Sequence, residues 1–318
     1  MPHRQAVKIG LIGLGKMGQN HLRILALLKS VELVFVYDMD TAQASRLAEV
    51  YGVKTSDKLE TLLPLVDAVV VCTPTVTHGE YIRKVASHVK NIFVEKPMAD
   101  TVEEAKALLE FSAAHNLRIQ VGFIERFNPA VQQLKAVLDK SDQVVSIDFT
   151  RTNKLSARIT DVDVVTDLMI HDIDLALYLN GPVSSVSAHG VAQGSMIDFA
   201  SALLTHRNGR FSRIQASRIT EKKIRTIQAT CMDMYVDCEL VRKELLINRQ
   251  SEIQQENDGP YTISSVEQTI EVRQQEALLT ELQGFIAFCR EEDVEVPTAL
   301  AGLQAADICD QIQKAVRK

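Results

Sequence analysis

Hydrophobic residues in the first 123 positions form short continuous runs, and segments with helical spacing lie between them. Short apolar runs that end at glycine, proline or an acidic residue are typical of strands buried on both faces. We predict five strands: Val7–Ile12, Val31–Tyr37, Asp67–Cys72, Asn91–Val94 and Arg118–Phe123. Four helices are predicted between them: Gly18–Leu28, Thr41–Tyr51 with Thr41 as its N-cap, His78–Ser87 and Val102–His115. This alternation indicates a parallel sheet with helices on both faces.

The pattern changes after Asn128-Pro129. Apolar and polar residues now alternate, as in strands with one buried face. Eight strands are predicted: Val144–Arg151, Val183–Val191, Ala200–Thr205, Phe211–Ile219, Arg225–Met232, Met234–Leu240, Glu244–Asn248 and Thr269–Arg273. Four helices accompany them: Pro129–Leu138, Val164–Leu179, Glu276–Arg290 and Ala299–Val316. Asn208-Gly209 is typical of a hairpin turn, and Gln250–Pro260 is expected to be a loop or hairpin tip.

Two domains follow from this change of pattern and from the length of 318 residues, which exceeds what one hydrophobic core usually supports. We predict an α/β domain over residues 1–124, with a doubly wound parallel sheet. Residues 125–318 are predicted to form a second, α+β domain with a large, mostly antiparallel sheet that binds substrate and mediates oligomerisation.

Charge and cysteine content narrow the functional classes. The net charge is −6 and no basic block occurs, which argues against nucleic acid as a partner. The five cysteines are scattered without a CxxC pair, as expected of free thiols in a reducing compartment. There is no apolar segment of membrane-spanning length and no signal-peptide pattern, so we expect a cytoplasmic protein without membrane contact.

Three glycines follow the first strand, in the order Gly13, Gly15 and Gly18. Such a set permits a tight turn, lets the backbone approach a pyrophosphate, and lets strand and helix pack closely. The helix that begins there, with Lys16 and Met17 in its first turn, offers unpaired N–H groups to phosphates. The alternative is a glycine-rich turn without a ligand.

Asp38 ends the second strand, 20 residues beyond Gly18. An acidic residue at this distance is typical of a Rossmann dinucleotide site, where it binds the adenosine ribose hydroxyls. Asp40 adds a second negative charge and no Lys or Arg stands between the two, so a 2′-phosphate would be repelled. We predict that the cofactor is NAD, not NADP. The alternative interpretation of Asp38 is a solvated surface acid.

The next two strands end in Cys72-Thr-Pro-Thr-Val-Thr-His78 and Val94-Glu-Lys-Pro97. A Glu-Lys-Pro after a Thr-Pro turn with a histidine resembles the Gfo/Idh/MocA oxidoreductases, and the resemblance extends over essentially the whole chain. It implies that Lys96 lies beside the nicotinamide and contacts the reacting sugar hydroxyl. It also implies that the cofactor site includes these residues: Thr73, Pro74, His78 and Glu95.

The second motif of that family is matched by Asp167-Leu-Met-Ile-His171-Asp172. Asp167 and His171 are four residues apart and would share a helix face. The family pattern makes them catalytic, together with Lys96. A histidine that titrates near neutrality can take the hydroxyl proton, while an ammonium stabilises the alkoxide. The alternative is a satisfied core histidine, and no third ligand with metal-binding spacing is found.

Glu125-Arg-Phe-Asn-Pro129 resembles the subgroup that acts on nucleotide-activated amino sugars, which includes UDP-N-acetylglucosamine 3-dehydrogenases. The predicted substrate contacts are Lys96, Arg126, Asn128, Lys154, Arg158, Asp167 and His171. The basic members could bind a pyrophosphate, the alternative being solvated surface bases. Asp163 departs from the pattern, which has glycine there, and leaves the local loop conformation open.

The predicted function is therefore NAD-dependent oxidation of a secondary hydroxyl, at C3 of a nucleotide-activated amino sugar. The alternatives are an inositol or free-sugar dehydrogenase, an NAD-dependent glycoside hydrolase, and a non-catalytic NAD-binding sensor. An exposed apolar face of the second sheet would be buried by association with another chain. Members of the resembling family commonly associate through such faces, so we expect a homodimer or homotetramer.

Overall fold

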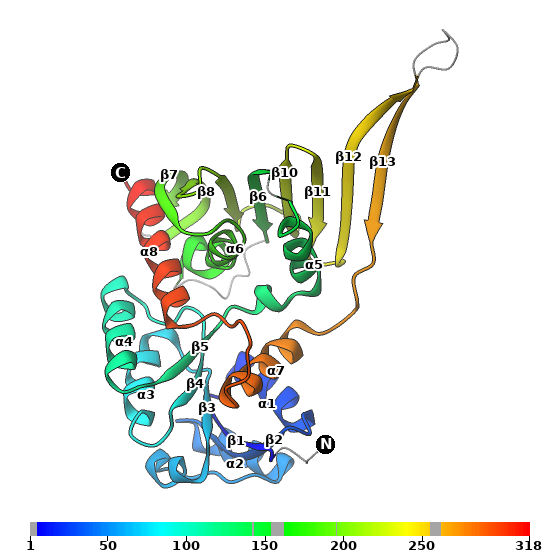
Figure 1. Ribbon diagram of the computed structural model, residues 1–318. Coiled ribbons are helices and arrows are strands. Elements are labelled where there is room, and N and C mark those ends of the chain that lie inside the picture. The colour runs from blue at the N-terminus through cyan, green and yellow to red at the C-terminus, as the bar shows by residue number, and fades with distance from the viewer. Residues whose placement is uncertain (1–4, 142, 154–161, 195, 255–261) are drawn as a thin grey trace. The chain divides into compact units, whose positions relative to one another are not determined.

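The computed structural model describes residues 5–141, 143–153, 162–194, 196–254 and 262–318 (Figure 1). The chain divides into two compact units. The first contains Met1–Ile124 and Glu276–Asp307, and the second contains Glu125–Gln275 and Ile308–Lys318. The prediction of a continuous second domain over residues 125–318 is thus corrected, because Glu276–Asp307 groups with the first unit.

The first unit is built on a five-stranded parallel sheet in the order β2-β1-β3-β4-β5. Its strands are β1 (Val7–Ile12), β2 (Val31–Tyr37), β3 (Ala68–Val71), β4 (Asn91–Glu95) and β5 (Arg118–Gly122). Its helices are α1 (Lys16–Leu27), α2 (Thr41–Tyr51), α3 (His78–Val85), α4 (Val102–Ala114) and α7 (Ala277–Cys289). The predicted strands and helices are confirmed, with ends shifted by one or two residues.

Helices cover both faces of this sheet, with α1 and α7 on one face and α3 and α4 on the other (Figure 1). Leu22 and Leu25 of α1 belong to the same buried apolar cluster as Leu282 and Phe285 of α7. Burying apolar side chains of this size stabilises the fold by roughly 1.5–3 kcal/mol each. The packing of α7 into this cluster explains why the segment after the second sheet belongs to the first unit.

The second unit contains an eight-stranded sheet in the order β13-β12-β11-β10-β6-β9-β8-β7, antiparallel except between β6 and β9. Its strands are β6 (Val144–Thr152), β7 (Val183–Gln193), β8 (Met196–His206), β9 (Phe211–Ser217), β10 (Ile224–Cys231), β11 (Met234–Glu239), β12 (Glu244–Gln254) and β13 (Thr262–Ile270). The prediction of an α+β domain with a mostly antiparallel sheet is confirmed.

The last two strands are longer than predicted. A loop or hairpin tip was expected over Gln250–Pro260, but its first five residues belong to β12, which continues to Gln254; residues 255–261 lie outside the described part of the chain. The polar sequence there gives no alternating pattern, and only pairing of β12 with β13 defines it as strand.

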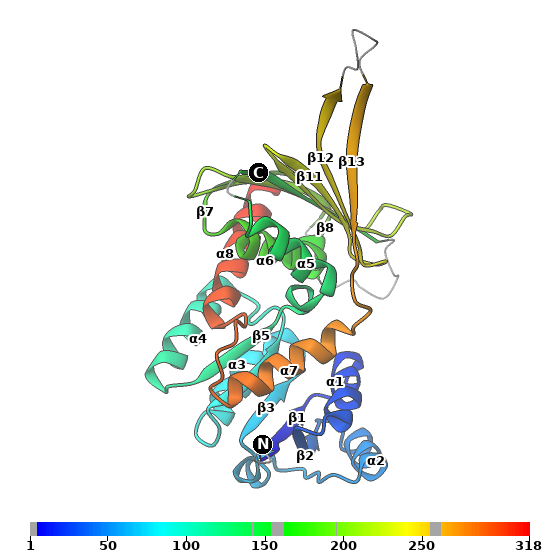
Figure 2. The same ribbon diagram turned by 45° about the vertical axis from the view of Figure 1, so that its right-hand side comes forward.

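Helices lie on one face of the second sheet. They are α5 (Pro129–Leu138), α6 (Ile170–Asn180) and the end of α8 (Ala299–Val316), as Figure 2 shows. The helix predicted over Val164–Leu179 is present, but its first part, Val165–Met169, is a π-helical turn that comes before α6. No helix in the described part of the chain is long and apolar enough to cross a membrane.

Candidate active site

The loop after β1 brings three glycines together, and each has a different role. Gly13 has a φ of 90°, and a Cβ there would lie 2.7 Å from the backbone of Cys72. A Cβ on Gly18 would lie 1.9 Å from the carbonyl oxygen of Gly13. A Cβ on Gly15 would meet nothing within 4 Å. Gly13 and Gly18 therefore shape the loop, whereas Gly15 leaves the backbone open to a ligand.

A cavity of about 660 Å³ lies over this loop, at the carboxyl ends of the parallel strands. Ligands of doubly wound sheets bind in this position. The cavity is lined by Gly13, Gly15, Met17, Asp38, Met39, Gln43, Cys72, Thr73, Pro74, Thr75, Thr77, His78, Tyr81, Glu95 and Lys96. The lining thus brings together all the residues predicted to bind the cofactor except Lys16 and Gly18. Lys16 is exposed at the start of α1.

The backbone holds the Asp38 carboxylate at the edge of this cavity. Its two oxygens accept the N–H groups of Leu14, at 2.6 Å, and Asp40, at 2.9 Å. Asp40 in turn accepts the N–H of Gln43 at 3.0 Å and is the N-cap of α2. The prediction of Thr41 as the cap was wrong, because the carboxylate one residue earlier reaches that N–H group.

His78 connects two of the loops that line the cavity. Its Nδ1 lies 2.9 Å from the carbonyl oxygen of Pro97, and its Nε2 lies 2.9 Å from that of Thr73. The ring is buried, and burial lowers the pKa of His78. It therefore ties the Thr73-Pro74 loop to the Lys96-Pro97 turn, whose peptide bond is cis.

Glu95 ends β4 and Lys96 follows it, whereas Asp38 follows β2. The strands β1 and β3 lie between β2 and β4. Asp38 and Lys96 therefore line opposite ends of the cavity. A dinucleotide with its adenosine ribose at Asp38 and its pyrophosphate over Gly15 would have its nicotinamide near Glu95 and Lys96. The cavity and the open backbone at Gly15 fit such a ligand.

In the second unit, Asp167 lies in the π-helical turn and His171 in the first turn of α6. The N–H of Ile170 donates to the carbonyl oxygen of Val165, five residues back. The predicted helix over Val164–Leu179 is present, and this π-helical turn lies within it. Such single π-helical turns are rare and frequently lie at functional sites.

Asp163 stabilises the start of this turn. One of its carboxylate oxygens accepts the N–H groups of Val165 and Thr166, each at 3.1 Å. The other accepts the side chains of Gln313, at 3.0 Å, and Arg317, at 3.1 Å, from α8. The aspartate that departs from the family's glycine is thus a helix cap and an anchor for the C-terminal helix.

Arg218 is a buried residue beside Asp167, with Nη2 at 3.3 Å from Oδ2. It follows β9, and its backbone N–H donates to Asp198 at 2.9 Å. Nothing in the local sequence indicated this pairing, since 51 residues separate the two. Arg218 orients the Asp167 carboxylate.

A second arginine, Arg151 near the end of β6, binds α6 through the side chain of Asp172. Its guanidinium donates to both carboxylate oxygens of Asp172 at 2.8 Å and to Glu125 at 2.8 Å. Burial alone would lower the pKa of Arg151, but the two carboxylates outweigh it and raise that pKa. The residue next to His171 is therefore fixed in a buried ion network.

The predicted substrate residues Arg126 and Asn128 are held within the second unit. Arg126 donates to both oxygens of Asp174, at 2.8 and 2.6 Å, and lies over the ring of Tyr178. The side chain of Asn128 accepts the N–H of Ala130 and caps α5. Their contact with substrate stays a prediction. Lys154 and Arg158 lie outside the described residues.

Comparison with known proteins bears on both units. The NAD-binding Rossmann-fold model of an oxidoreductase family matches residues 7–123, and the C-terminal-domain model of the same family matches residues 143–233. The chain belongs to the Gfo/Idh/MocA family. It is accordingly an NAD-dependent oxidoreductase, and the glycine loop and the cavity over it lie in the domain that the NAD-binding model matches.

Individual relatives include a sugar-nucleotide dehydrogenase and an inositol dehydrogenase. The chain is 29% identical over 287 residues to a UDP-N-acetylglucosamine 3-dehydrogenase of Acidithiobacillus ferrooxidans, with 88% of each chain covered. A solved structure of that enzyme superimposes with a TM-score of 0.88 over 98% of each chain, at 27% identity. A scyllo-inositol 2-dehydrogenase (NAD(+)) of Bacillus subtilis is 33% identical over 235 residues, 67% of each chain.

Several residues of the site were missed by the sequence analysis. His21 was assigned no role, yet its ring is fully buried against Glu95. Gln43 donates from Nε2 to the carbonyl oxygen of Leu14 at 2.5 Å and lines the cofactor cavity. The position of Gln43, in the first turn of the helix that follows Asp38, could have indicated from the sequence that it lies near the cofactor cavity. For His21 and Arg218 the partner lies too far along the chain.

Proposed function

We propose that this NAD-dependent oxidoreductase oxidises a secondary hydroxyl of a nucleotide-activated amino sugar, at C3 of UDP-N-acetylglucosamine, to a ketone. The observation that carries the proposal is the likeness to a UDP-N-acetylglucosamine 3-dehydrogenase over nearly the whole length of both chains. The side chains of the site fit the oxidation of a sugar hydroxyl, since they include the Lys96 ammonium, the His171 imidazole and the Asp167 carboxylate.

Within the proposal, Lys96, His171 and Asp167 are the catalytic residues. Bound NAD supplies the hydride acceptor, at C4 of its nicotinamide. The His171 imidazole takes the proton of the hydroxyl, and the Lys96 ammonium stabilises the negative charge that develops on the oxygen. Asp167, held by Arg218, orients the sugar. The predicted substrate contacts of Arg126, Asn128, Lys154 and Arg158 belong to the same proposal.

A substrate assay tests the proposal. The purified chain is mixed with NAD and one of three compounds: UDP-N-acetylglucosamine, free N-acetylglucosamine or myo-inositol. NADH formation is followed by absorbance. Turnover of the first compound at a kcat/KM at least about a hundredfold above the second is expected, because a bound pyrophosphate adds several charge-assisted hydrogen bonds.

The second candidate, an inositol dehydrogenase, is favoured by the 33% identity to the scyllo-inositol enzyme. Turnover of myo-inositol without turnover of the nucleotide sugar would establish it and end the nucleotide-sugar proposal. Release of free sugar without net NADH would indicate a glycoside hydrolase. Lys96→Ala and His171→Ala serve as controls, since each should abolish NADH formation; a double variant with full function would indicate a sensor.

We also propose that the open face of the second sheet pairs with another copy of the chain, as a homodimer or homotetramer. Leu203 of β8 and Tyr235 of β11 are exposed on strands of this sheet. Size-exclusion chromatography with light scattering would measure the oligomeric state.

A cytoplasmic location is proposed because all five cysteines are free thiols, as is typical of reducing compartments.

A further inference from the structure

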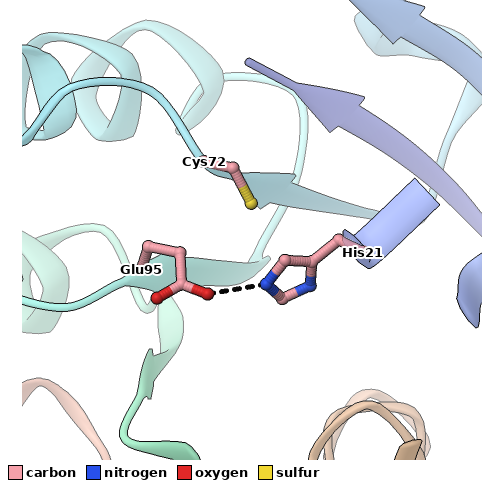
Figure 3. Close-up of side chains that lie close together, drawn as sticks. All are labelled: His21, Cys72 and Glu95. Atoms are coloured by element: carbon pink, nitrogen blue, oxygen red, sulfur yellow. Dashed lines mark hydrogen bonds and ion pairs between the residues drawn. The ribbon is translucent and has the colours of Figure 1, made fainter. Parts of the chain in front are cut away.

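Three side chains meet at the inner wall of the cofactor cavity, beside the predicted nicotinamide position. His21 comes from α1, Cys72 from the end of β3 and Glu95 from the end of β4 (Figure 3). Each side chain offers one atom that could bind a metal ion, namely a ring nitrogen of His21, the Sγ of Cys72 and a carboxylate oxygen of Glu95, and these atoms lie within 4.8 Å of one another. Cys72 and Glu95 line the cavity, and the His21 ring lies behind them, edge-on to Phe93 at 5.1 Å.

The closest contact in this cluster is a direct hydrogen bond, not a metal bridge. The Nε2 of His21 lies 2.6 Å from Oε1 of Glu95. A metal ion bonded to both atoms at about 2.0–2.2 Å would hold them farther apart, near 3 Å or more in a tetrahedral site. The cluster is therefore organised around the contact between imidazole and carboxylate.

The burial of His21 decides which atom carries the proton. Among the described residues, none makes a hydrogen bond with Nδ1, which is buried. A proton on Nδ1 would leave a buried donor without an acceptor, whereas a proton on Nε2 is donated to the carboxylate. The arrangement favours a neutral imidazole with its hydrogen on Nε2 and an ionised Glu95, so the pair carries one negative charge.

The second oxygen of Glu95 is also confined. Oε2 accepts the N–H of Lys96 at 3.2 Å. A Cβ at Gly122, on the neighbouring strand β5, would lie 2.9 Å from the same oxygen. The carboxylate occupies a space that exists only because residue 122 has no side chain, and His21 closes it from the other side.

The Cys72 thiol beside this carboxylate is subject to two negative charges. Burial raises the pKa of the Cys72 thiol well above its usual value, and the charges of Glu95 and then of Glu281 raise it further. Glu281 comes from α7 and is fully buried. The wall of the cavity at Cys72 and Glu95 therefore disfavours additional negative charge, whereas Lys96, the next residue of the chain, supplies an ammonium to the same end of the cavity.

We propose that His21 is a positioning residue that holds the Glu95 carboxylate as an anion against the nicotinamide end of the cavity, and that this charge shifts the cofactor preference toward NAD⁺. The nicotinamide ring is positively charged in NAD⁺ and neutral in NADH, and the two cofactors are otherwise alike. A fixed negative charge beside the ring therefore stabilises the oxidised form selectively. The inference rests on NAD binding in this cavity and on no particular sugar.

The test measures the dissociation constants of NAD⁺ and NADH for the full-length chain, without sugar. The variants are Glu95→Gln, His21→Leu and His21→Gln, which keeps a side-chain N–H. The ratio Kd(NAD⁺)/Kd(NADH) should rise about tenfold in Glu95→Gln and about three- to tenfold in His21→Leu. It should stay within about twofold of the wild-type ratio in His21→Gln.

The matched control is His88→Leu, the same substitution at an exposed histidine of the first unit, which should leave the ratio unchanged. An unchanged ratio in Glu95→Gln overturns the electrostatic effect. A raised ratio in Glu95→Gln with an unchanged one in folded His21→Leu overturns the role of His21. If His21→Leu does not fold, a ratio in His21→Gln as high as in Glu95→Gln contradicts the proposal that a donated side-chain N–H holds the Glu95 carboxylate, because glutamine supplies that donor. A loss of affinity for both cofactors by one factor would also contradict the proposal.

Discussion

At the scale of the residue, the three glycines of the cofactor loop carry different constraints. Gly13 is required by its own backbone conformation, and Gly18 by the carbonyl oxygen of Gly13 that lies against it. Gly15 has an extended backbone with φ of −61° and open space around it. Of the three, only Gly15 could carry a Cβ without a clash in the fold itself, so contact with the cofactor is the role that we propose for it.

A pair of substitutions separates these roles. Gly13→Ala should lower the free energy of unfolding by about 1–3 kcal/mol, because it forces a side chain into a strained, crowded position. Gly15→Ala should change it by less than about 0.5 kcal/mol but weaken NAD binding about tenfold or more. Urea denaturation and NADH fluorescence titration measure the two quantities. Equal loss of stability in both variants would contradict the assignment.

At the scale of the element, α6 is positioned by buried ion pairs at its sides. Arg151 of β6 binds Asp172, and Arg126 binds Asp174, both with two hydrogen bonds. These contacts hold α6, which carries His171, while Asp163 caps the π-helical turn that carries Asp167. The two elements that bear the predicted catalytic residues, the π-helical turn and α6, are thus fixed by buried polar contacts with their neighbours.

Removing the central cation should therefore be costly. Arg151→Met would remove the bidentate partner of the buried Asp172 and would leave Glu125 with only Asn128 and the more distant Arg225, so we expect the second unit to lose about 3–5 kcal/mol of stability. The control is Arg213→Met on β9, whose partner Asp148 is also on β6 but whose side chain is 67% exposed. That variant should lose at most about 1 kcal/mol. Urea denaturation measures both, and similar losses would refute the buried network's importance.

At the scale of the whole molecule, buried histidines make stability depend on pH. Burial lowers the pKa of His78 in the first unit and of His206 in the second. Both are buried, and His206 lies 2.7 Å from the carbonyl oxygen of Gly181. In the unfolded chain each should titrate at its ordinary value of 6.5.

The sign of the effect follows from proton uptake. As pH falls through 6.5, the unfolded chain binds protons that the folded chain does not, so stability decreases. The loss is at most about 1.4 kcal/mol per pH unit for each histidine. Denaturation midpoints measured on both sides of this pH should show it. His78→Gln should flatten the dependence, whereas His88→Gln, at an exposed position, should not; equal slopes would contradict the prediction.

Much of this molecule follows from local sequence alone. The five parallel strands are predictable because buried strands appear as short apolar runs. The glycine loop is predictable because the spacing from Gly13 to Asp38 corresponds to one helix followed by one strand. The strands of the second sheet are predictable from another local pattern, because apolar and polar residues alternate along a strand that has one buried face. Lys96 and Glu95 were found through the motif that contains them.

Tertiary structure decided what depends on residues far apart in the chain. His21 and Glu95 are separated by 74 residues, and Arg218 and Asp167 by 51, so no periodicity could connect them. The membership of Glu276–Asp307 in the first unit depends on α7 packing into a core formed by the N-terminal third. Sequence determined which segments are strands and where the cofactor loop lies. Only the fold determined which buried charges meet, because a hydrogen bond depends on distance in space.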